Sequence, residues 1–139
     1  RTLVLSVFLF FLMLRLPPRS TPFPSTTLFR SYSGALEILS EQADPHSAVE
    51  VQILLGQVLG DAGRGGEAAE HYLEGLALAE ANDFRMLQGE LLARLGEVES
   101  DRSQKMEYLQ RSLSVFRELG AVDSMREVQT AVHRAVMGH

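Results

Sequence analysis

The segment from Leu54 to Glu80, LLGQVLGDAGRGGEAAEHYLEGLALAE, contains two apolar patterns separated by a glycine-rich break. On each side of the break, apolar residues recur three and four positions apart, which is typical of amphipathic helices. The break at 60–66, GDAGRGG, is rich in the residue types that end helices and form turns. The segment therefore predicts two helices that fold back on each other as a hairpin.

The same periodicity extends over residues 32–139, and turn-forming residues divide this part of the chain again near 44–45, 82–83, 99–101 and 120–123. No stretch alternates apolar and polar residues as a half-buried strand does. We therefore expect an all-α chain, an α-solenoid of antiparallel helix hairpins that is incomplete at both ends. The predicted helices are 33–43, 46–60, 66–81, 84–98, 103–118 and 122–137.

Residues at fixed positions in the two central hairpins resemble the tetratricopeptide repeat (TPR) family. In that family, the first helix carries a Leu-Gly pair and the second a small residue followed by an aromatic one. The resemblance covers nearly all of 32–139, with a partial repeat at 32–45, full repeats at about 46–83 and 84–121, and a partial repeat at 122–139. The residues that carry the pattern, and that we expect to pack the repeats, are Leu55, Gly56, Leu59, Ala68, Tyr72 and Gly75, then Leu95, Gly96, Leu109 and Ser112.

Glycines inside the predicted helices support this packing independently. Glycine in a helix interior costs roughly 1 kcal/mol relative to alanine, yet Gly56, Gly75, Gly89 and Gly96 all fall within helical stretches. A close crossing of the paired backbones would offset this cost, with larger side chains such as that of Tyr72 filling the space around it. Because one hairpin cannot cover its own apolar face, stacking on neighbouring repeats must supply the core.

Residues 1–31 differ from the rest of the chain, since they contain four arginines and no acidic residue. The apolar run from Leu3 to Leu14, flanked by Arg1, is compatible with a targeting segment. However, FFLMLRLPPRSTPFPSTTLFRS, from Phe10 to Ser31, resembles a translated sequencing-library adapter. We therefore interpret 1–31 as a non-native lead and expect 32–139 to carry the fold.

Removal of the lead tests this division of the chain. We expect a chain that begins at residue 32 to retain or increase its helical circular-dichroism signal, because the lead adds nothing to the repeat core. Loss of the helical signal on deletion would mean that the lead is structural.

Residue types that support catalysis or metal binding occur without the spacing that these functions require. The stretch from Gly63 to Gly66 lacks the lysine and Ser/Thr of a phosphate-binding loop, so we expect a hinge turn there. Glu67 and His71 stand four positions apart, but a metal site needs at least three ligands. We predict no catalytic, cofactor-binding or metal site and no enzymatic activity. Three large apolar residues are expected in the core: Met86, Met106 and Phe116.

The charge of the chain bears on its partners. All 18 acidic residues lie beyond residue 31, and the chain contains no cysteine. An acidic surface disfavours binding to a phosphate backbone, and the absence of cysteine excludes disulfides and thiolate metal sites. We expect no direct nucleic-acid binding and no membrane association, and we place the protein in the cytoplasm.

The TPR resemblance implies a concave groove, lined by the first helix of each hairpin, that holds a peptide or a partner protein. An acidic groove would favour a basic or amphipathic partner segment, with charge acting mainly on encounter rate and specificity. The resemblance thus implies a protein–protein interaction scaffold, and the alternative for this surface is an ordinary solvated face. Counted from the Leu-Gly pairs, the groove-facing positions are Glu50, Ile53, Gln57 and Asp61, then Glu90, Ala93, Glu97 and Asp101.

A second resemblance gives a different functional expectation. The sequence SLSVFRELGAVDSMREV, from Ser112 to Val128, is similar to the repeat tracts of large bacterial signalling proteins. It implies, as the alternative to a general scaffold, a sensor or regulatory repeat tract within a larger bacterial ATP-binding signalling protein or transcriptional regulator.

Overall fold

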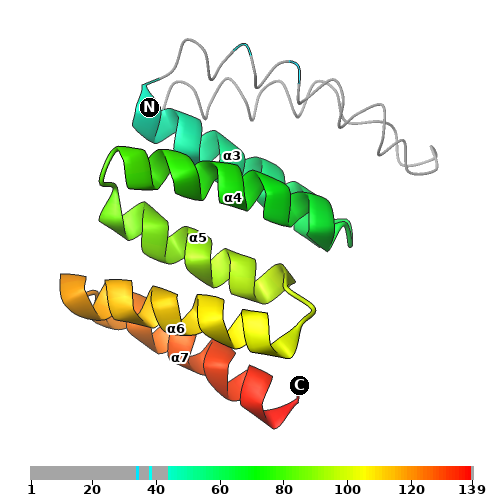
Figure 1. Cartoon of the computed structure of the whole chain (residues 1–139), viewed down its shortest axis with the longest axis vertical. Helices are drawn as coiled ribbons and strands as arrows, with labels where there is room; N and C mark the ends of the chain where they lie inside the picture. The colour runs from blue at the N-terminus through cyan, green and yellow to red at the C-terminus, as the bar shows by residue number, and fades with distance from the viewer. Residues whose placement is uncertain (1–33, 35–37, 39–43, 139) are drawn as a thin grey trace.

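The protein is described here by a computed structural model, which covers Gly34, Ile38 and residues 44–138 (Figure 1). Each of the five helices predicted between 46 and 137 is present, with both ends within one residue of the predicted position. The lead at 1–31 and most of the helix predicted at 33–43 lie outside the described residues. The helices are α3 (Pro45–Asp61), α4 (Gly65–Ala81), α5 (Arg85–Val98), α6 (Arg102–Leu119) and α7 (Val122–Met137).

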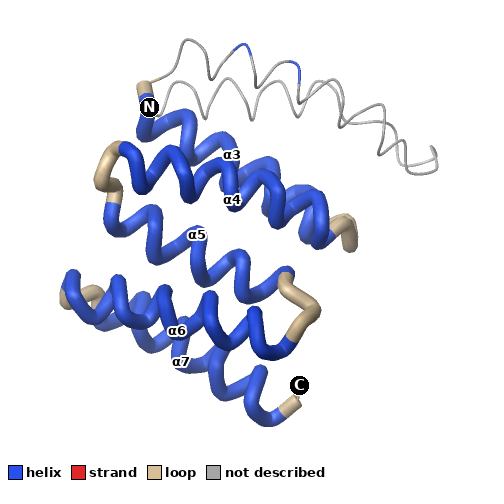
Figure 2. Tube along the Cα trace, in the orientation of Figure 1, coloured by secondary structure: helices blue, strands red, loops and turns tan. Residues whose placement is uncertain are grey.

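Neighbouring helices pack in succession along the chain, and the described residues contain no strand (Figures 1 and 2). Each helix contacts the next one in the sequence, from α3 through α7. Helix α3 also contacts α5 directly, so the first helices of these two hairpins touch each other. The architecture is therefore all-α, with antiparallel hairpins stacked as in a helical repeat array.

Side chains and turn geometry set where the helices begin and end. The carboxylate of Asp44 accepts a hydrogen bond from Ser47 N at 2.7 Å, and Pro45 occupies the first turn, where its missing N–H costs nothing. Asp101 starts α6 in the same way, accepting from Gln104 N at 3.0 Å. After α3, α4 and α6, a residue with positive φ reverses the chain, a conformation suited to glycine; these residues are Gly63, Asp83 and Gly120.

The core lies between the paired helices and between successive hairpins. The larger cluster joins α3, α4 and α5 and also includes Val115 of α6, and a smaller one joins α6 to α7 through Leu109, Phe116 and Val128. All ten residues that the sequence assigns to repeat packing are buried. Leu59, Ala68, Leu95, Leu109 and Ser112 are each at most 2% exposed.

Glycines mark the closest approaches between helices. A Cβ atom placed on Gly56 would collide with the ring of Tyr72, and one on Gly96 would lie 2.7 Å from Leu109 Cδ2. Gly75 is less constrained, since its Cβ would lie 3.2 Å from Leu91 Cδ2. In each hairpin, the glycine of the Leu-Gly pair therefore leaves space for a large side chain of the second helix.

Another close approach at a glycine shows that the two hairpins place their larger side chains on different helices. A Cβ on Gly89 would lie 2.5 Å from Phe116 Cε1. By the spacing of the repeats, Gly89 and Phe116 correspond to Val49 and Ala79 in the first hairpin. The first hairpin thus places its larger side chain on the first helix, whereas the second places it on the second helix. In this exchange, a smaller side chain on one helix is matched by a larger one at the facing position, as dense packing requires.

This exchange predicts the stability of variants at Gly89. Gly89→Ala should lower the free energy of unfolding by about 1–3 kcal/mol, because the added methyl group overpacks against Phe116. The matched control is Gly66→Ala, where an added Cβ would have no neighbour within 4 Å. Urea unfolding followed by circular dichroism measures both.

A double variant tests the exchange itself. Phe116→Ala alone should destabilise by about 3–5 kcal/mol because it leaves a cavity. Adding Gly89→Val, which reproduces the arrangement of Val49 and Ala79, should recover part of this loss. If the two changes simply add, the facing positions do not share one volume.

Candidate functional site

A pocket opens between α5 and α7, with α6 behind it. Its acidic walls are formed by Glu90, Glu97 and Glu127, and its apolar lining includes Ala93 and Phe116. Glu90, Ala93 and Glu97 are three of the residues that the sequence places in the groove, so the structure brings them together. We call the surface between α5 and α7 the α5–α7 seam.

Two of the predicted groove residues are placed elsewhere. Ile53 is 6% exposed and belongs to the core cluster that includes Leu91 and Leu92 of α5, so its assignment to the groove is corrected. It is covered because α3 and α5 are in direct contact. Asp101 is exposed, but its carboxylate caps the N-terminus of α6, and it does not line the pocket.

The remaining three predicted groove residues lie on α3, away from the α5–α7 seam. Gln57 and Asp61 are exposed, in the last two turns of the helix. Glu50 is partly buried, with one carboxylate oxygen 3.3 Å from His46 Nδ1 and the other buried without a hydrogen-bond partner among the described residues. His46 in turn makes an edge-on ring contact with Phe84.

Sequence reasoning assigned only three of the residues that line the pocket, and Glu127 and Met86 are among those that it missed. Helix α7 lacks a Leu-Gly pair, so its groove-facing residues, including Glu127, were not assigned. Tyr72 and Leu109, which occupy equivalent positions, are 37 residues apart. The same step from Glu90 leads to Glu127, so this count could have identified Glu127 as a groove residue. Met86, expected in the core, is 50% exposed and lines the pocket instead.

Arg94 connects the pocket to the core. Its guanidinium donates from Nη2 to Glu90 Oε1 at 3.1 Å and from Nε at 3.3 Å, and it also interacts electrostatically with the hydroxyl of Tyr72 on α4. Burial acts to lower the pKa of Arg94, but the Glu90 carboxylate and these hydrogen bonds together raise it above its ordinary value. The charged Arg94 is therefore paired with Glu90. Glu97 and Glu127 are the other two acidic residues that line the pocket.

Tyr72, like Arg94, has a pKa that its surroundings shift. Burial raises the pKa of its hydroxyl because the phenolate would lose its hydration, and the negative charges of Glu97 and Asp61 raise it further. Arg94 acts in the opposite direction, but its effect is smaller. The ring of Tyr72 therefore packs on Gly56, while its hydroxyl stays neutral beside the pocket.

The raised pKa predicts how stability changes in alkaline solution. In the unfolded chain, the Tyr72 hydroxyl titrates near pH 10, below its pKa in the fold. The stabilisation from the neutral hydroxyl is therefore complete below pH 10 and is lost as the pH rises through the folded pKa. Between about pH 8 and about pH 11, the free energy of unfolding should fall more steeply in the unmodified chain than in Tyr72→Phe.

Urea unfolding at the two pH values measures this difference, because the two chains differ only at the Tyr72 hydroxyl and every other group is common to both. Tyr108→Phe serves as the control and should keep the full pH dependence. Equal slopes for the unmodified chain and Tyr72→Phe would contradict the prediction.

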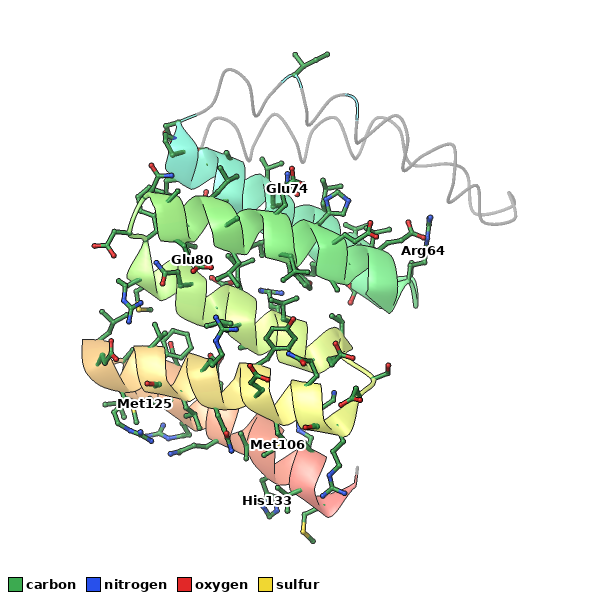
Figure 3. All side chains as sticks on the ribbon, viewed as in Figure 1. Arg64, Glu74, Glu80, Met106, Met125 and His133 are labelled. Atoms are coloured by element: carbon green, nitrogen blue, oxygen red, sulfur yellow. The ribbon has the colours of Figure 1, made fainter. Side chains whose placement is uncertain are left out.

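The residues that suggested metal or phosphate chemistry have structural partners. The carboxylate of Glu67 pairs with Arg64 through two hydrogen bonds, of 2.9 and 2.6 Å, at the start of α4 (Figure 3). His71 Nδ1 lies 2.9 Å from Gln52 Oε1, which joins α4 to α3. Within the described residues, no group of three or more His, Cys, Asp and Glu side chains is close enough to hold a metal ion.

A scan against protein-family models found no match for the chain, and a search of the curated proteins found none either. Among the residues that the structure describes, no helix is both long and apolar enough to cross a membrane. The function must therefore be inferred from the chemistry of the chain's own residues, above all from those of the α5–α7 seam.

Proposed function

We propose that the protein is a TPR-type interaction scaffold in the cytoplasm that binds a basic, amphipathic segment of a partner protein along the α5–α7 seam. The observation that carries the proposal is the pocket in the seam, which combines acidic walls with an apolar lining. A partner side chain with an aliphatic stem and a cationic tip, lysine or arginine, matches both parts of such a pocket.

The arrangement of the carboxylates supports this choice of partner. Glu97 is exposed, and no ion pair engages Glu97 or Glu127 within the described part of the chain. Their hydrated carboxylates can accept a cation without first breaking an internal salt bridge. Glu90 differs, because Arg94 holds it in one orientation while leaving it partly exposed.

Packing around the pocket supports a site that is formed before the partner binds. The lining residues Phe116 and Val128 are each 4% exposed and belong to the core between α6 and α7. Arg94 is oriented by its two hydrogen bonds to Glu90 on the same helix. A preorganised surface of this kind loses little conformational entropy on binding.

A charge-neutralising pair of substitutions tests the proposal. The probe is a fluorescein-labelled peptide of about 15 residues, built from Lys, Leu and Ala with the lysines on one helical face. Glu97→Gln combined with Glu127→Gln should weaken binding by about tenfold, because two charge pairs are lost. Fluorescence anisotropy measures the affinity, which should also fall as salt is added.

The matched control changes the net charge by the same amount away from the pocket. Glu74→Gln on α4 (Figure 3) and Glu107→Gln on α6 remove two exposed carboxylates, neither of which lines a pocket of the seam. This control should leave the affinity nearly unchanged. If both pairs of substitutions weaken binding equally, only the overall charge of the protein attracts the peptide, and the proposed site is wrong.

A further inference from the structure

A second pocket continues the α5–α7 seam toward the C-terminal ends of both helices. It shares Glu97 and Ala131 with the first pocket, so the two are adjacent parts of one surface. Small residues such as Gly96, Ala135 and Gly138 leave its centre open. The seam is therefore longer than the acidic pocket alone.

The charge of this second pocket is reversed. Three basic side chains line it, Arg102, Lys105 and Arg134, against the single carboxylate of Glu97. Arg102 Nη2 donates to Val136 O at 3.1 Å, and Lys105 Nζ donates to Glu97 O at 3.4 Å. These carbonyls lie at the C-terminal ends of α7 and α5, where each supplies only a partial negative charge. No carboxylate forms an ion pair with any of the three within the described residues.

The repeat spacing shows that, on the first helices, the charge changes sign along one row of positions and stays acidic along another. Glu50, Glu90 and Glu127 are equivalent in α3, α5 and α7, so this row is acidic in every first helix. The equivalent row two turns later reads Gln57, Glu97 and Arg134. The seam therefore has an acidic end, marked by Glu90 and Glu127, and a basic end, marked by Arg134.

We propose that the seam binds a partner segment with charges of opposite sign at its two ends and fixes the direction of that segment. Basic residues lie beside Glu90 and Glu127, and an acidic side chain or terminal carboxylate lies beside Arg102, Lys105 and Arg134. This inference rests on the proposed function, and it adds the charge order of the partner and its orientation. Reversed placement is disfavoured because it sets like charges against each other at both ends.

Paramagnetic labelling tests the orientation directly. The probe is a peptide of about 15 residues with three lysines at one end, three glutamates at the other, and Leu and Ala between them. A nitroxide on the glutamate end should broaden the amide resonances of Ala135 and Gly138 most strongly in the full ¹⁵N-labelled chain. A nitroxide on the lysine end should broaden those of Met86 and Ser124. Equal or reversed broadening would overturn the inference.

A charge reversal at the basic end provides the second measurement. Arg134→Glu should weaken binding of the two-signed peptide by about threefold and should tighten binding of an all-lysine peptide of equal length. The matched control is Arg117→Glu, because Arg117 is also an exposed basic residue in the last turn of its helix but lies outside both pockets. The control should change neither affinity.

The two proposals fail in different ways. If no peptide broadens resonances along the seam, the proposed function is wrong and the orientation falls with it. If the all-lysine and two-signed peptides both bind in the seam but Arg134→Glu affects neither, only the inference about charge order is wrong.

Discussion

The close crossing of the two helices in each hairpin is the constraint on which the rest of the structure depends. At Gly56, Gly89 and Gly96, a Cβ atom would overlap a large side chain of the second helix. These contacts fix the distance between paired backbones, and that distance sets which residues of the first helix face its partner. The remaining face of the first helix is then available to the neighbouring repeat and to the groove. The glycines thus act on the candidate site indirectly, by positioning the helices that carry it.

Tyr72 and Arg94 link this packing to the pocket. The ring of Tyr72 occupies the space that Gly56 leaves, and its hydroxyl interacts electrostatically with Arg94 on the next hairpin. Arg94 in turn orients Glu90 through two hydrogen bonds. A chain of contacts therefore runs from the centre of the first hairpin to a carboxylate at the pocket wall. A shift between the two hairpins would move Glu90 together with the core.

Periodicity and turn residues were sufficient to predict the described helices, because these depend on local sequence. The ten residues expected to pack the repeats came from the TPR resemblance, and all ten are buried. The groove was predicted only in part. Ile53 was misplaced because direct contact between α3 and α5 covers it, and such a contact depends on how closely adjacent hairpins stack. Glu127 was not assigned to the groove because α7 lacks a Leu-Gly pair. Met86 and Arg94 were not assigned either, since their roles depend on the angle between α5 and α7. The distance between repeats can be counted along a sequence, whereas the angle between them cannot.

Packing and recognition use different faces of the same helices, and this separation explains how the charge of the seam can vary between repeats. Glu90 and Glu97 lie seven positions apart, close to two turns of helix, so they share one face. Leu92, Leu95 and Gly96 lie on the buried side of α5 and are constrained by their neighbours. A change from Glu97 in one repeat to Arg134 in the next alters no core contact, because both side chains are exposed. Repeats that pack in the same way can therefore carry different charges at equivalent exposed positions. The order of these charges along the groove can then determine which partner segment binds.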